Sequence, residues 1–87
     1  MNYKINTDKI LYSQVGEDGV IYDLIDNEYV SINETFFKII KSIEEGKTKQ
    51  EIVAALCEEY NISEADCLTS VDKAIKQLEE KAFIKTA

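Results

Sequence analysis

The hydrophobic periodicity of the chain changes once, at Asn33, and this change constrains the fold more than any other feature. Residues 1 to 32 contain β-rich runs separated by turn residues, whereas residues 33 to 82 repeat apolar side chains at helical spacing. A sheet this small cannot bury itself, so one of its faces must pack on the helices. With 87 residues there is room for one small domain, and we expect residues 1–87 to form it.

The first third of the sequence predicts three strands. They span Lys9 to Val15, Val20 to Ile25 and Glu28 to Ile32. Gly16 to Gly19 is a turn signal, and Asp26-Asn27 offers two residues that tolerate positive φ, as a two-residue hairpin loop requires. The order predicts a three-stranded antiparallel meander.

Three helix starts follow the meander. Asn33, Thr48 and Ser63 are favourable N-cap residues, and Thr48 opens a T-x-x-E capping box. Gly46 and Asn61 stand where helices end. The last two helices are compatible with a helix-turn-helix arrangement. The expected fold class is therefore α+β: a winged helix-turn-helix-like domain with a three-stranded antiparallel meander followed by three helices.

The composition excludes several function classes. The chain has no His and no Arg, so it lacks an imidazole base, a Ser-His triad, histidine metal ligands and the bidentate phosphate fork. Its net charge of −7 argues against a nucleic-acid partner. No apolar run approaches the roughly 20 residues of a membrane span, and no signal segment is visible. We expect a cytoplasmic monomer or weak homodimer with no catalytic residue, cofactor, metal, nucleic acid or membrane partner.

The two cysteines, Cys57 and Cys67, stand ten residues apart. This spacing is neither a CxxC redox pair nor a structural zinc site. We interpret both as reduced cysteines that act as small hydrophobic side chains.

The run from Glu28 to Ile32 is the last strand of the meander, so it is expected at a sheet edge. Glu28 is its only charge, and no Pro, Lys or bulge glycine protects it. Such an edge is covered by a helix, pairs with its own copy or accepts a peptide strand. These three possibilities stay open on the residues alone.

The third helix offers a second indication. One flank carries Cys67, Ser70, Ala74 and Gln77, which are small or uncharged. Such a flank leaves room for another chain. The competing interpretation is contact with the protein's own N-terminal segment.

Several segments resemble, in order, motifs of the PqqD-like family. YVSINET at residues 29–35 resembles its aromatic-x-x-Leu-Asn-x-Thr segment. The chain also carries the family's Gly-x-Thr at 46–48 and its Glu-Ile-Val at 51–53. Tyr60-Asn61-Ile62-Ser63 resembles the family's Tyr-Asp-Val turn, and Phe83-Ile84 falls on its final Gly-Leu-Ile. The resemblance covers about residues 15 to 85. The chain departs from the family at Ile40, where tryptophan is usual, and at Ala82, where glycine is usual.

The resemblance implies a non-catalytic domain that recognises precursor peptides of ribosomal peptide modification pathways. The leader segment would add as an antiparallel strand beside the third strand, in a cleft bounded by the third helix. The domain, here in a free-standing version, would present it to a modifying enzyme such as a radical SAM enzyme or a leader protease. The expected peptide-binding residues are Tyr29, Val30, Ser31, Ile32, Cys67, Ser70, Val71, Ala74, Gln77 and Leu78.

Two other functions stay open. A winged-helix DNA-binding regulator would share the architecture, because fold does not decide function. Residues 49 to 81, however, carry four lysines against eight acidic residues, and this negative charge would repel the phosphate backbone of DNA. An unrelated interaction module is the third possibility.

Overall fold

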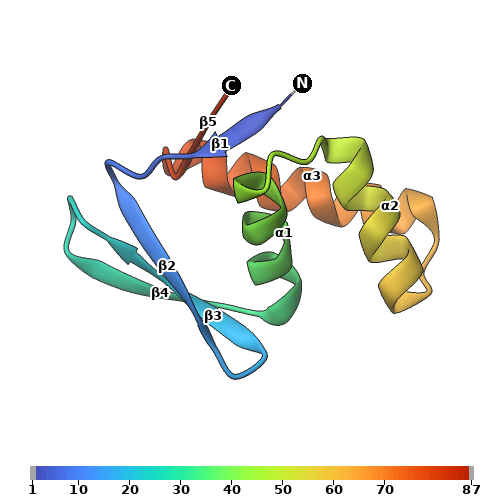
Figure 1. Cartoon of the computed structure of the whole chain (residues 1–87), viewed down its shortest axis with the longest axis horizontal. Helices are drawn as coiled ribbons and strands as arrows, with labels where there is room; N and C mark the ends of the chain where they lie inside the picture. The colour runs from blue at the N-terminus through green and yellow to red at the C-terminus, as the bar shows by residue number, and fades with distance from the viewer. Residues whose placement is uncertain (1, 87) are drawn as a thin grey trace.

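The computed structural model describes residues 2–86, which form two small sheets and three helices (Figure 1). The elements are β1 (Tyr3–Ile5), β2 (Ile10–Val15), β3 (Asp18–Asp23), β4 (Glu28–Ile32), α1 (Glu34–Glu44), α2 (Lys49–Tyr60), α3 (Glu64–Glu80) and β5 (Ile84–Thr86). Strands β2, β3 and β4 pair in sequence order as an antiparallel sheet. The α+β class and the meander followed by three helices are confirmed.

Both hairpin loops differ in length from the expectation. The β2–β3 turn contains only Gly16 and Glu17, with Gly16 at φ 64, because Asp18 and Gly19 already belong to β3. The β3–β4 loop has four residues, 24 to 27, so the predicted two-residue loop at Asp26-Asn27 is wrong.

The carboxylate of Asp23 explains the longer loop. Its Oδ1 accepts hydrogen bonds from the backbone N–H groups of Ile25 and Asp26, each 3.0 Å long. This side-chain turn ends β3 at Asp23 and folds the next residues around the carboxylate. Asn27 then takes the left-handed conformation, at φ 57, that its residue type tolerates.

The helix boundaries follow the capping signals. The side chains of Asn33, Thr48 and Ser63 each accept a hydrogen bond from the backbone N–H three residues on, and the capping box at Thr48 is complete. Gly46, at φ 81, follows α1, and Asn61, at φ 52, ends α2. The expected starts and stops are confirmed.

A second sheet, which no pattern in the sequence predicted, joins the two ends of the chain (Figure 1). Strand β1 pairs antiparallel with β5, with Tyr3 opposite Thr86 and Ile5 opposite Ile84. Asn6 reinforces the junction, because its Nδ2 donates to the Ala82 carbonyl at 2.8 Å. Ala82 itself lies at φ 59, which explains why the resembled family has glycine there.

Helix α1 lies between the three-stranded sheet and the α2–α3 pair (Figure 1). Its Phe37 packs on Gly19 of β3 so closely that a Cβ at that glycine would lie 2.6 Å from the ring. The most buried side chains come from every layer: Ile10, Ile21, Ile39, Ile40, Ile43, Ile52, Cys67, Val71 and Leu78. This packing holds the β4 edge near the end of α3.

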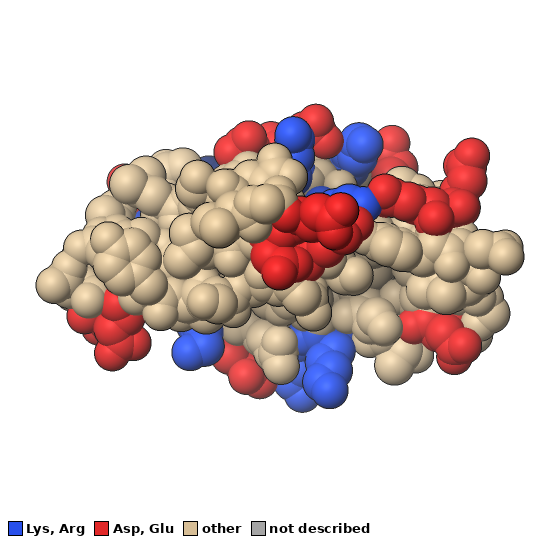
Figure 2. Space-filling view, turned by 90° about the horizontal axis from the view of Figure 1, so that it is seen from below, with Lys and Arg blue, Asp and Glu red and all other residues tan. Residues whose placement is uncertain are grey.

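Charge is unevenly spread over the surface. Figure 2 shows a mostly uncharged area on its left, with acidic side chains and a basic side chain at its margins. None of the helices within residues 2–86 combines the length and the apolar character that crossing a membrane requires.

Candidate functional site

Strand β4 is an edge of the three-stranded sheet, since β3 is its only partner among the described strands. One hydrogen bond next to the β2–β3 ladder shows which residue pairs of the sheet are hydrogen-bonded. It joins the Leu24 N–H to the Lys9 carbonyl, 2.7 Å away. Hydrogen-bonded and non-hydrogen-bonded pairs alternate along an antiparallel ladder. Counting back from Leu24, the backbone of Tyr22 therefore bonds to β2, and that of Ile21 bonds to β4.

This phase decides which backbone groups of β4 are free. Val30 and Ile32, opposite Ile21 and Gly19, direct their N–H and C=O groups to β3. The corresponding groups of Tyr29 and Ser31 point away from the sheet. The open edge thus offers two N–H donors and two carbonyl acceptors to an added strand.

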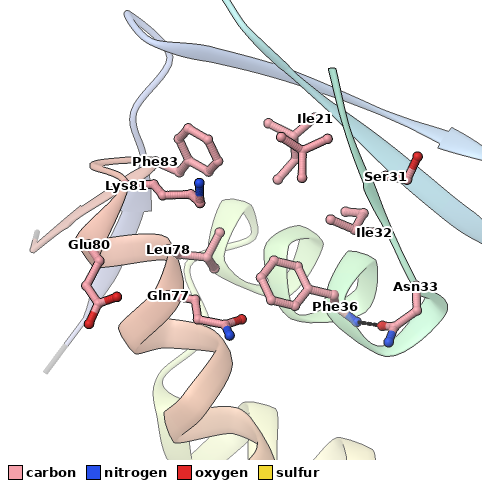
Figure 3. A pocket seen from close by; sticks show the side chains of 11 residues that line it. Ile21, Ser31, Ile32, Asn33, Phe36, Gln77, Leu78, Glu80, Lys81 and Phe83 are labelled. Atoms are coloured by element: carbon pink, nitrogen blue, oxygen red, sulfur yellow. Dashed lines mark hydrogen bonds between the residues drawn. The ribbon is translucent and has the colours of Figure 1, made fainter. Parts of the chain in front are cut away.

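A groove of about 490 Å³ runs beside this edge, between β4, α1 and the end of α3 (Figure 3). Its floor is apolar and includes Ile32, Phe36, Leu78 and Phe83, whose side chains converge on the cavity in Figure 3. The volume lies in the range of pockets that hold small ligands or side chains. The groove can therefore accept apolar side chains from a strand bound to β4.

Polar groups border the groove on the α3 side. In Figure 3 Gln77 and Lys81 extend toward the opening, whereas Glu80 directs its carboxylate away from it. Gln77 and Lys81 are four residues apart and therefore occupy one helical face. Within residues 2–86 no cluster of three metal-ligating side chains occurs.

Half of the expected site residues meet at this groove. Val30, Ser31 and Ile32 line it from β4, and Gln77 and Leu78 line it from α3. Ser31 contributes its backbone, because its hydroxyl points away from the cavity in Figure 3.

Tyr29 does not reach the groove. Its side chain is 75% exposed on the opposite face of the sheet and lies against Tyr22, with ring centroids 4.7 Å apart. Only its backbone belongs to the open edge.

The remaining expected residues lie elsewhere on α3. Cys67, Val71 and Ala74 are buried in the core, and Ser70 is exposed without lining the groove. The Cys67 Sγ donates to the Val53 carbonyl at 3.4 Å, and burial raises the pKa of its thiol. Of the flank that the sequence suggested for another chain, Cys67 and Ala74 are occupied by internal packing, and only Gln77, near the end of α3, lines the groove.

Six groove residues were not expected from the sequence: Ile21, Asn33, Phe36, Glu80, Lys81 and Phe83. A signal for one of them existed. Phe36 and Phe37 are adjacent, so their side chains leave α1 about 100° apart. Since Phe37 packs on the sheet, Phe36 had to face sideways, toward the edge.

The chain has recognisable relatives. The family model described as Coenzyme PQQ synthesis protein D (PqqD) matches residues 18–84. The chain belongs to the PqqD family. A comparison with curated protein sequences finds no match.

Two solved structures share the PqqD-family fold over nearly the whole chain. One is "TbiB1 in Complex with the TbiA(beta) Leader Peptide", with a TM-score of 0.86, 24% identity, and coverage of 97% of this chain and 96% of that chain. The other is "Lasso peptide synthetase B1 complexed with the leader peptide", with a TM-score of 0.87, 19% identity, and coverage of 98% and 99%. The expected resemblance to the PqqD-like family is confirmed.

Proposed function

We propose that this PqqD-family chain binds the leader segment of a ribosomally made precursor peptide and presents it to a modifying enzyme. The observation that carries the proposal is the unpaired β4 edge beside an apolar groove. An extended leader pairs antiparallel with β4 and bonds to the free backbone groups of Tyr29 and Ser31. The two solved structures with this fold contain leader peptides, which supports the proposal.

The geometry of strand addition defines which leader side chains are read. In an antiparallel pair, opposite residues place their side chains on the same face of the sheet. Leader residues opposite Val30 and Ile32 therefore enter the groove over Phe36, Leu78 and Phe83. We expect these leader residues to be apolar.

The proposed role is non-catalytic and cytoplasmic, and residues 1–87 act in it as one recognition domain. The groove supplies backbone donors and apolar surface. Tethering the precursor beside the enzyme raises the local concentration of the segment to be modified.

A DNA-binding role fits the same architecture less well. In a helix-turn-helix the second helix enters the groove of DNA, and α3 carries five acidic residues against two lysines. Phosphate contacts supply most of the affinity of such proteins, so this helix repels the partner it would need.

The first prediction tests strand addition. Ser31→Pro removes an N–H that points to the leader, so the affinity for a synthetic leader peptide should fall about tenfold while the melting temperature changes little. Isothermal titration calorimetry with the leader of the precursor encoded beside this gene measures the affinity.

Val30→Pro is the matched control on the same strand. It removes an N–H that bonds to β3, so it should lower the melting temperature markedly. If folded Ser31→Pro binds the leader as tightly as the unaltered chain, the leader does not pair with β4.

A further inference from the structure

The face of the three-stranded sheet that turns away from α1 exposes a row of apolar side chains. Leu11 is 58%, Val15 61% and Tyr29 75% exposed, and Val20 and Tyr22 are partly exposed. Leu11 lies opposite Tyr22, and Tyr22 lies opposite Tyr29, so the row crosses all three strands. We call these five residues the outer-face patch.

The outer-face patch is more than scattered exposure. Single apolar residues on a surface are ordinary, whereas a contiguous group marks an interaction site. Leu11, Val20, Tyr22 and Tyr29 also line a shallow hollow. Among residues 2–86 no helix or loop covers this face of the sheet (Figure 1).

Acidic residues stand at both ends of the outer-face patch. Glu17 and Asp18 occupy one hairpin end, and Asp26 and Glu28 occupy the other. Residues 10 to 32 contain no lysine or arginine. Figure 2 shows a mostly uncharged area on its left, with acidic side chains at its lower left and toward the centre, and with a basic side chain at its lower edge.

This charge pattern selects among possible occupants. A partner with an apolar centre and lysines or arginines at its margin complements the patch. A second copy would bring acidic margins together, and an anionic membrane would be repelled.

The outer-face patch is continuous with the proposed leader site. A strand added to β4 widens the sheet, and its residues opposite Tyr29 and Ser31 place their side chains on the outer face. A protein that covers the patch therefore also touches the outward side of a bound leader. An enzyme that acts on the precursor would contact both the outer-face patch and the bound leader, and these two contacts together would place it beside its substrate.

We propose that the outer-face patch docks the modifying enzyme through an apolar, basic-edged surface of that enzyme. The proposal rests on the function proposed above. It adds that one sheet serves two partners, the leader at its edge and the enzyme on its outer face.

The test uses the purified peptide-modifying enzyme encoded beside this gene, with surface plasmon resonance as the readout. Leu11→Lys places a cation in the patch on β2, where an edge strand tolerates lysine. The affinity for the enzyme should fall at least tenfold. The affinity for the leader, measured by calorimetry, should stay within twofold, because Leu11 lies two strands away from the β4 edge.

Leu68→Lys is the matched control. Leu68 is 41% exposed on α3, outside the sheet, and its replacement should leave both affinities within twofold. Equal effects of the two variants on enzyme binding, or no effect of Leu11→Lys, would overturn the proposal. So would a stable dimer of the unaltered chain that Leu11→Lys dissociates, as seen by analytical ultracentrifugation. If the enzyme binds through Leu11 while the leader does not bind at all, the docking surface stands and the proposed function fails.

Discussion

At the scale of single residues, Tyr29 and Ile32 serve opposite faces of the same strand. Tyr29 is 75% exposed and Ile32 is 8% exposed. They are three positions apart, and side chains alternate along a strand, so one turns outward when the other turns inward. Ile32 therefore belongs both to the core and to the floor of the groove.

Ile32→Ala should lower the free energy of unfolding by about 2–5 kcal/mol, because it removes a buried branched side chain and leaves a cavity. Urea denaturation measures this loss. Ser31→Ala, one position earlier and exposed, should stay within about 0.5 kcal/mol of the unaltered chain. A loss of only a few tenths for Ile32→Ala would mean that its side chain is not part of the core.

At the scale of elements, α3 has two parts with different tasks. Its earlier turns bury Cys67, Val71 and Ala74 in the core, whereas Gln77 and Leu78 line the groove. The helical period is the same throughout, so the division comes from where the helix passes its neighbours.

Ala74→Glu should therefore unfold the domain instead of selectively weakening leader binding. Ala74 is buried, and a buried carboxylate without a partner costs several kcal/mol. Thermal melting followed by circular dichroism should show the loss. Gln77→Glu, one turn later and exposed, should melt near the unaltered chain and alter only the affinity for the leader. A normal melting temperature for Ala74→Glu would contradict the position of α3 in the core.

At the scale of the whole molecule, ion pairs tie elements together despite the net charge of −7. The Lys38 ammonium bridges Glu34, at 2.8 Å, and Glu59 of α2. The Tyr60 hydroxyl donates to Glu34 Oε1 at 2.8 Å. These bonds from Lys38 and Tyr60 hold the pKa of Glu34 below its usual value.

The lowered pKa of Glu34 has a consequence for acid stability. Its carboxylate stabilises the folded state at pH values above its ordinary pKa of 4.5, and this contribution is lost as the pH falls through the lower folded pKa. Glu34→Gln should melt below the unaltered chain at pH 7, and the gap should narrow from about pH 4.5 downward. Calorimetric melting of both proteins between pH 7 and pH 2 provides the comparison. A gap that stays constant over this range would show that folding does not favour the ionised carboxylate.

The sequence by itself determined the features that depend on a few neighbouring residues. The caps at Asn33, Thr48 and Ser63 are examples, because each bond joins a side chain to a backbone group three positions away. The edge position of β4 also followed from local patterns, since sequential strands in a meander pair with their neighbours. Even among local features, the length of the β3–β4 loop was not predicted, because it depends on the Asp23 carboxylate, which accepts hydrogen bonds from the backbone N–H groups of Ile25 and Asp26.

Only the tertiary structure decided which of these elements meet. The β1–β5 pair joins residues about 80 positions apart. A strand of three residues is too short to show a periodic pattern, so the sequence does not predict which strand it pairs with. The groove likewise required knowing which turn of α3 passes β4. Periodicity shows that a helix has an apolar face, but the position along that face where a neighbour crosses depends on the packing of the whole core. Cys67 and Leu78 are equally buried, and only the placement of α3 makes one of them part of the site.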